Sequence, residues 1–362
     1  MKRTLFILLL LGLTLPSFAQ EGSMYLSSQR QPIRVSVNAL YQTYERDSLQ
    51  VSEVSVPVSI LVPIGQKVAF SLQAGQASAT GDNLESLSGV SDVQAGLSFL
   101  QKIGSSSLVL SLGANLPSGK RELTEQEFQT SLLLSQHFYD FRIPGFGQGF
   151  NVAPGFVWAF PMSETVVLGL GASYQYKGAY RPLAEMPEDY DPGDEIIITG
   201  GLDIKAAPTT NLSADVTYTT YTSDKLGEEE VFAVGDRLVA TGQVLTYFGV
   251  NELRVVGRYR GQSESSLPAG AGGTDEALRT LPAQGLIRLA YRQALGNMVW
   301  VGLLGQARLY DETSLFEKAS LFDAGLLPEV AVSPSVRLQS RFIYTFGDFS
   351  GFEVGGGLVL SL

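Results

Sequence analysis

The sequence contains no cysteine, a single histidine and no long apolar run after its first residues. Without cysteine the chain cannot form the disulfides on which small secreted domains depend, and with one histidine it lacks the ligands of most zinc sites. Acidic residues outnumber basic ones by 36 to 25, and the formal net charge is −11. Because phosphate binding needs clustered Lys and Arg, this balance argues against nucleic acid as a partner.

The N-terminus has the three parts of a secretory signal peptide: basic residues, an apolar run and the small-x-small end Ser-Phe-Ala. The apolar run is shorter than the ~20 residues that a membrane helix needs, and no later stretch approaches that length. We expect cleavage after Ala19, which makes residues 1–19 a signal peptide, 20–30 a short N-terminal segment and 31–362 one domain. The chain is therefore expected to be exported.

Beyond this peptide, apolar and polar residues alternate with a period of two, in about sixteen segments that read as strands. The weakest of them are 236–248 and 325–332, and without these two the number is about fourteen. The segments are 31–44, 51–62, 67–78, 90–100, 105–116, 148–160, 165–177, 194–205, 210–222, 236–248, 252–263, 281–292, 297–309, 325–332, 335–345 and 351–362.

The connections between these segments alternate between short and long. The short ones lie near 63–66, 101–104, 161–164, 206–209, 249–251, 293–296 and 333–334. The long ones are 45–50, 79–89, 117–147, 178–193, 223–235, 264–280, 310–324 and the briefer 346–350. Outer-membrane barrels have an even strand number, short periplasmic turns and long outer loops, whereas a soluble sandwich or propeller has no reason to sort its loops. The sequence therefore predicts an all-β fold, a transmembrane antiparallel β-barrel in the cell outer membrane.

Aromatic residues recur near the ends of the segments, and amphipathic rings favour the headgroup level of a bilayer. We expect them to form two girdles around the barrel. They are Tyr41, Tyr44, Trp158, Phe160, Tyr174, Tyr176, Tyr218, Tyr221, Tyr247, Phe248, Tyr259, Tyr291, Tyr310, Phe342 and Tyr344.

In the C-terminal third, arginines share the polar face of the alternation. A one-residue slip in register would place each in lipid at a cost of ~2–4 kcal/mol near the midplane, so the register is strongly fixed. Asp203 and Asp215 are expected on the facing wall. The two walls either create a transverse field in a water-filled pore or pair with each other across a small or plugged lumen, and the sequence leaves both open. The predicted pore-lining arginines are Arg254, Arg258, Arg260, Arg288, Arg292, Arg308, Arg337 and Arg341.

The longest loop, 117–147, contains a capping-box spacing from Thr124 to Glu127, so it is expected to begin a short helix. This helix either folds into the barrel and narrows it or lies across the outer mouth, and we favour the second arrangement. Acidic residues gather in the loop 178–193 and at 228–230. Carboxylates suit Ca²⁺, but without an EF-hand-like spacing a solvated acidic loop is the preferred interpretation, and no metal site is predicted.

An enzyme is not expected. A Ser–His hydrolase would need His137, the only histidine, to be held beside a serine by a third polar group. Ser131 and Ser135 are near in sequence, but a loop helix is a poor place to hold such a triad, and Gly-x-Ser-x-Gly is absent. The sequence gives no sign of a cofactor.

Residues 88–119 contain two short motifs, Gly-x-x-Asp-Val at Gly89, Asp92 and Val93, and Leu-Pro-Ser-Gly at 116–119. They resemble the meta-pathway phenol-degradation family of outer-membrane proteins, and the stretch covers under a tenth of the chain. The resemblance implies a barrel that passes small, often aromatic, molecules. The related fatty-acid transporter family has an N-terminal hatch with Asn-Pro-Ala that is missing here. The Phe-Ala-Gln end of the signal peptide is similar to those of Bacteroidota-like bacteria.

We therefore expect an outer-membrane barrel for passive passage of small anionic or aromatic and hydrophobic solutes. Its expected partners are outer-membrane lipid and lipopolysaccharide, the barrel-assembly machinery and the solutes themselves. One alternative is a non-conducting barrel that serves as a scaffold, an adhesin or a secretion accessory. Another is a soluble, secreted all-β binding protein.

Overall fold

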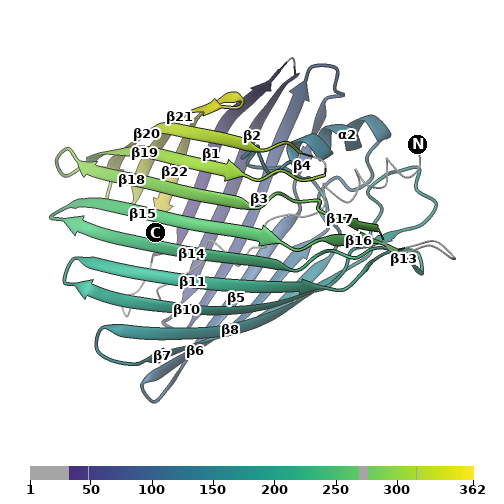
Figure 1. The fold of residues 1–362 in the computed structure, drawn as a ribbon. Helices are drawn as coiled ribbons and strands as arrows, with labels where there is room; N and C mark the ends of the chain where they lie inside the picture. Colours follow the sequence, from purple (N-terminus) through teal and green to yellow (C-terminus); the bar gives the residue numbers. More distant parts are fainter. Residues whose placement is uncertain (1–31, 48, 269–275, 315) are drawn as a thin grey trace.

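The structure is a computed structural model, which describes residues 32–47, 49–268, 276–314 and 316–362. The expected signal peptide and the segment 20–30 lie outside the described residues. Sixteen strands form one closed antiparallel barrel (Figure 1), which confirms the predicted fold class. They are β1 (Arg34–Arg46), β2 (Leu49–Ile64), β3 (Val68–Gly81), β5 (Val93–Ile103), β6 (Ser106–Leu116), β7 (Asn151–Pro161), β8 (Val166–Lys177), β10 (Glu195–Ala207), β11 (Thr210–Tyr221), β14 (Arg237–Phe248), β15 (Asn251–Gln262), β18 (Gln284–Ala294), β19 (Val299–Tyr310), β20 (Ala319–Ser333), β21 (Val336–Gly347) and β22 (Ser350–Ser361).

Pairing between the first and last strands closes the barrel. β1 and β22 pair in antiparallel fashion from Arg34 opposite Ser361 to Glu45 opposite Ser350. The other barrel strands pair with their neighbours in the chain, and β4 (Leu87–Val90) continues the line of β5 along β3. No edge strand of the barrel is left open, which is the condition for a sheet that faces lipid.

The turns and loops sort to opposite ends of the barrel, as the sequence predicts. The short turns lie at one end and the long loops at the other, and the last strand ends at the short-turn end (Figure 1). Both weak segments are strands. β20 begins at Ala319 rather than at 325, because residues that we expected in a loop pair with β19 and β21.

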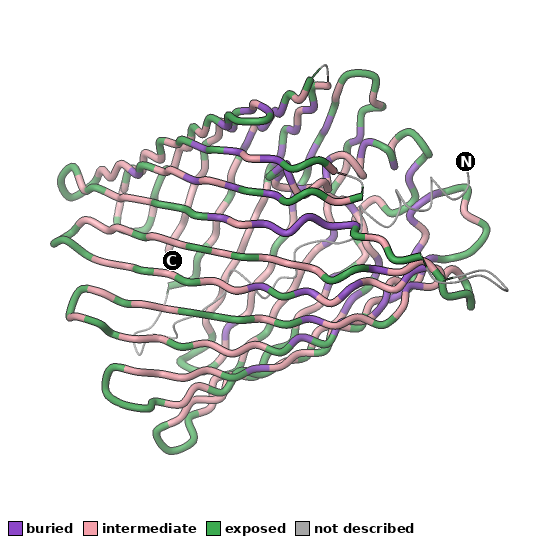
Figure 2. Tube along the Cα trace, in the orientation of Figure 1, coloured by how far each residue is buried: buried purple, intermediate pink, exposed green. Residues whose placement is uncertain are grey.

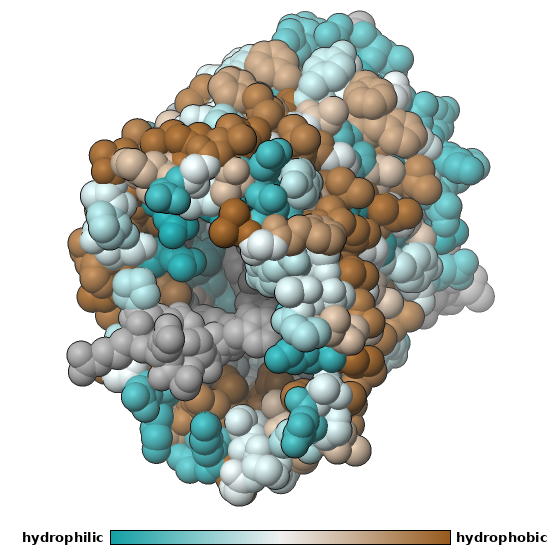
Figure 3. Space-filling view, turned by 90° about the vertical axis from the view of Figure 1, so that its left-hand side faces the viewer, coloured by the Kyte–Doolittle hydropathy of each residue, from teal (hydrophilic) through white to brown (hydrophobic). Residues whose placement is uncertain are grey.

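The outer wall is apolar and the strand alternation sets which residues face it. Large apolar side chains such as Val216, Ile287 and Leu338 are exposed around the barrel, and brown apolar surface follows the wall around a hollowed short-turn end (Figure 3). Outward aromatics such as Trp158 and Phe160, which stack, fit the girdle prediction. For four residues this prediction is wrong, because their cross-strand partners place them on the inner face: Tyr44, Tyr221, Tyr247 and Tyr310.

Residues of the long loops pack against inward side chains at the long-loop end of the barrel. Buried stretches gather at this end of the barrel (Figure 2), where an apolar core joins inward side chains such as Val51 and Leu321 to loop residues such as Phe128 and Phe138. No helix in the described ranges is long and apolar enough to cross a membrane. The loop elements are α2 (Glu125–Leu134), β9 (Tyr190–Asp191), β12 (Asp224–Leu226), β13 (Glu229–Phe232), β16 (Ser265–Leu267) and β17 (Glu276–Leu278).

The alternation on β11 gives a matched test of the two faces. Val216 is half exposed on the outer wall, and the next residue, Thr217, faces inward opposite Thr199. We expect Val216→Arg to reduce the free energy of folding into lipid vesicles by about 2–4 kcal/mol, because it places a charge in the apolar belt. Thr217→Arg should cost much less. Equal losses, measured by urea titration in vesicles, would contradict the assignment of faces.

Candidate functional site

The long loop between β6 and β7, residues 117–150, enters the barrel and forms the centre of the candidate site. Its helix α2 begins with the predicted capping box: the Thr124 hydroxyl accepts from the Glu127 amide at 3.2 Å, and the Glu127 carboxylate accepts from the Thr124 amide. The helix lies at the outer end, where Thr130 donates to the carbonyl of Glu85 at 2.7 Å. The chain then turns into the lumen. The helix therefore lies at the outer mouth (Figure 1), the arrangement that we favoured, and it is the residues after the helix that enter the lumen.

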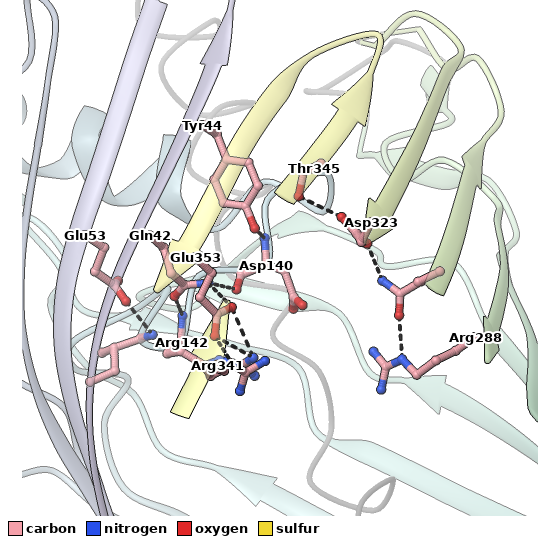
Figure 4. Close-up of polar contacts among 12 residues, drawn as sticks. Gln42, Tyr44, Glu53, Asp140, Arg142, Arg288, Asp323, Arg341, Thr345 and Glu353 are labelled. Atoms are coloured by element: carbon pink, nitrogen blue, oxygen red, sulfur yellow. Dashed lines mark hydrogen bonds and ion pairs between the residues drawn. The ribbon is translucent and has the colours of Figure 1, made fainter. Parts of the chain in front are cut away.

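Residues 137–143 cross the inner surface between two groups of strands (Figure 4). On the β19 side, Arg308 Nη1 donates to the carbonyl of Phe138 at 3.0 Å, and the Tyr310 hydroxyl donates to the carbonyl of His137 at 2.9 Å. These wall side chains bind backbone groups of the loop. The contacts therefore fix the path of the loop rather than one of its side chains.

On the β1 side, Gln42 bridges the backbone of the loop. Its Nε2 donates to the carbonyl of Asp140 at 2.6 Å, and its Oε1 accepts from the amide of Arg142 at 2.9 Å. The next strand contributes Glu53, whose carboxylate accepts from the amide of Ile143 at 3.2 Å. The polar loop backbone is therefore satisfied inside the barrel, as burial requires.

The base of the loop is held by Asp92, which is buried on the inner face. One carboxylate oxygen accepts from the amide of Gly119 at 2.8 Å, and the other accepts from Asn115 Nδ2 at 2.7 Å and the amide of Gln148 at 2.8 Å. A Cβ on Gly119 would lie 1.9 Å from the carbonyl oxygen of Phe146, so glycine is required there. The two motifs at 89–93 and 116–119 thus meet and clamp both ends of the loop.

All eight predicted arginines lie on the lumen face of β15, β18, β19 and β21, which we call the arginine wall. The register pairs Arg254 with Ala290 and Arg260 with Gln284. Arg288 donates to Gln306 Oε1 at 2.5 Å, and Arg308 pairs with Asp323 at 2.8 Å. The loop adds a ninth guanidinium, Arg142, which sequence analysis did not single out.

Positive charge exceeds negative charge in this part of the lumen. Glu329 is shared by Arg292 at 2.9 Å and Arg337 at 3.3 Å. Two further carboxylates are shared in the same way: Glu353 pairs with Arg142 and Arg341, and Glu195 pairs with Lys177 and Arg237. Each of these three carboxylates serves two cations, so pairing leaves surplus positive charge in the lumen, both at the arginine wall and beside it, where Glu195 and its partners lie on β8, β10 and β14.

The surrounding charges shift the pKa values of two loop residues, Asp140 and Arg142. Burial would raise the pKa of Asp140, but four arginines outweigh it and hold that pKa below its ordinary value: Arg142, Arg308, Arg288 and Arg341. Burial would likewise lower the pKa of Arg142, but Asp140 and Glu353 raise it above its usual value. Both groups are therefore charged at neutral pH, and the lumen contains fixed charges of both signs.

The predicted acidic wall does not face the arginines. Asp203 and Asp215 lie on the inner face of β10 and β11, and only β14 separates β11 from β15. The two aspartates therefore flank the arginine wall. In a ring of sixteen, β3 lies half-way round from β15 and β8 lies half-way round from β21. The facing wall is thus the inner surface of β3, β5, β6, β7 and β8, whose polar residues are mainly amides and hydroxyls.

His137 is partly buried in the loop, next to the buried Phe138. Desolvation, with help from Arg260 and Arg237, lowers its pKa well below the ordinary value, so the ring is neutral at pH 7. Ser135 donates its hydroxyl to the carbonyl of Leu132 at 3.0 Å. In the part of the chain that the structure describes, no group of three acidic or histidine side chains is placed to hold a metal ion.

Asp140, Gln42 and Glu353 were missed because their roles depend on where the loop lies. A signal was available for Gln42 and Glu353, since both stand at inward positions of the alternation on β1 and β22. No periodicity identified Asp140 or Arg142, because irregular segments carry none.

No protein-family model matches the sequence, and comparison with curated proteins finds no match either. Among solved structures, the chain is similar to the CymD monoaromatic hydrocarbon channel, with 12% identity, a TM-score of 0.47 and coverage of 92% of this chain and 89% of that one. It is also similar to OccD3 of Pseudomonas aeruginosa, with 9% identity, a TM-score of 0.47 and coverage of 92% and 91%. An anion-selective porin from Comamonas acidovorans has 13% identity, a TM-score of 0.44 and coverage of 92% and 99%.

The clamp at Asp92 predicts a selective loosening of the loop. Asp92→Ala removes three hydrogen bonds to a charged acceptor, each worth about 1.5–3 kcal/mol. We expect the folded barrel to persist while trypsin cuts the loop near Lys120 and Arg121 at least tenfold faster. Asp224→Ala is the control, because Asp224 holds a different loop through the Tyr190 hydroxyl and the Gly193 amide. Equal cutting in both variants would contradict the clamp.

Proposed function

We propose that the protein is an outer-membrane channel through which small anionic solutes pass passively, narrowed by the loop 117–150. The observation that carries the proposal is the sharing of single carboxylates by two cations at Glu195, Glu329 and Glu353. A lumen with surplus positive charge attracts anions and repels cations, and low-dielectric walls strengthen that field. In this proposal, the eight predicted pore-lining arginines attract the anion from the lumen face. Asp203 and Asp215 lie on the same face and line the pore beside them.

The membrane location rests on the apolar outer wall and the closed sheet. We infer that outer-membrane lipid and lipopolysaccharide surround the barrel, that the barrel-assembly machinery inserts it, and that residues 1–19 direct export. From the short motifs we also infer a relationship to the meta-pathway family and an origin in a Bacteroidota-like bacterium. The resemblance to that family implies that aromatic solutes also pass. Cation–π contact with the arginines would favour the passage of such solutes.

Ion preference tests the arginine wall. Arg258→Ser combined with Arg288→Ser removes two of its charges, and we expect the chloride-to-potassium permeability ratio to fall several-fold, since each charge contributes about 0.5–1 kcal/mol to the local potential. The measurement is the reversal potential across a planar bilayer in a KCl gradient. Arg181→Ser is the control, because Arg181 pairs with Asp189 in an outer loop. An unchanged ratio in the double variant would count against the proposal.

A second function is favoured by the apolar core at the long-loop end of the barrel. If the loop and this core seal the barrel, the protein is a non-conducting scaffold or adhesin that acts through its outer loops. Replacement of residues 122–146 by a short Gly-Ser linker separates the two functions. A constricted channel should conduct before the change and several-fold more after it, whereas a sealed barrel should conduct only after it.

A further inference from the structure

The wall opposite the arginines, together with the adjoining strand β2, presents a continuous row of uncharged hydrogen-bonding groups. Ser59 on β2 is opposite Gln73 on β3, Gln73 is opposite Gln94 on β5, and Gln94 is opposite Asn115 on β6. Neighbouring positions are small, with Gly75 and Gly96 on the same inner face. The absence of a side chain at Gly75 leaves room for Ile143 of the loop, whose Cδ1 atom would lie 2.5 Å from a Cβ at that position, so the loop packs closely beside the row.

A cavity of about 380 Å³ lies between this row and the loop. Its walls include Ser59, Gln73 and Gln94 on the barrel side, and Arg142 and Phe146 on the loop side. This volume falls within the range of small-molecule sites, which is roughly 300–1,000 Å³. Arg142 lines the cavity, and its guanidinium also pairs with Glu353, the carboxylate that it shares with Arg341 of the arginine wall. The cavity is thus adjacent to the anion-attracting part of the lumen.

Among the described residues, the polar groups of the row differ in whether they already have protein partners. Asn115 is committed, since it donates to Asp92 and to the carbonyl of Gly149. Within the described residues, the amides of Gln73 and Gln94 and the hydroxyl of Ser59 form no hydrogen bond with another protein group. An amide offers two donors and an acceptor, and a hydroxyl offers one donor and two lone pairs. Together they match the hydroxyl groups of a polyol and have no charge to offer an ion.

We propose that this cavity binds the hydroxylated part of a solute whose acidic group is held at the neighbouring arginines. The solute class is a small polyhydroxylated acid, such as a sugar acid. The inference rests on the proposed function and narrows it, because it assigns separate subsites to the acid group and to the hydroxyl groups. An anion without hydroxyls gains only the first of these contacts.

The test compares gluconate with hexanesulfonate, two six-carbon anions of which only gluconate carries hydroxyl groups. Permeability relative to chloride is measured from bi-ionic reversal potentials in planar bilayers. We expect the intact protein to favour gluconate about fivefold, which corresponds to one or two net hydrogen bonds. The double variant Gln73→Leu and Gln94→Leu should reduce that ratio towards one and leave the chloride-to-potassium ratio unchanged.

Gln243→Leu is the matched control, because Gln243 faces the lumen from β14, outside the cavity. If the double variant does not refold, Ser59→Val tests the same row and should reduce the ratio about twofold. A gluconate preference that is absent from the intact protein, or that survives in the folded variants, would overturn the inference. Absence of chloride selectivity in the intact protein would instead overturn the proposed function, so the two failures are distinguishable.

Discussion

The backbone pairing that closes the barrel is the constraint on which the rest of the structure depends. A sheet that faces lipid must leave no N–H or C=O group unpaired, and pairing of β1 with β22 meets this requirement. Closure divides every strand into an outward and an inward set of side chains. It therefore places the apolar residues against lipid and the arginines in the lumen, where a shift of one residue would exchange them.

The interior that results has two unlike walls and a loop that lies between them. Several arginines of one wall compete for a few carboxylates, whereas the facing wall offers amides, hydroxyls and small residues. The loop 117–150 is attached to the barrel at its base by Asp92 and at its tip by Gln42, Glu53 and Arg308. Because these contacts reach backbone atoms, the loop has a defined path, and its charged residues Asp140 and Arg142 are fixed in the lumen.

Most of the fold could be predicted from the period-two alternation, because the alternation of apolar and polar residues can be recognised within each strand separately. The sixteen strands, the sorting of loops and the lumen position of the arginines were all predictable in this way. The path of the loop was not, since an irregular segment has no period and its contacts join residues such as Gln42 and Arg142 that are distant in sequence. The prediction that Asp203 and Asp215 lie on the wall facing the arginines was wrong. Which strands face each other depends on the number of strands and their order around the ring, and no single segment encodes either.

Conductance of the refolded, unmodified barrel in a planar bilayer with a KCl gradient tests the central claim most directly. The account predicts steady single-channel steps and a reversal potential of the sign set by chloride, because the arginine wall carries surplus positive charge. A reversal potential of the opposite sign, or silence from protein shown to be folded by its heat-dependent gel mobility, would contradict it.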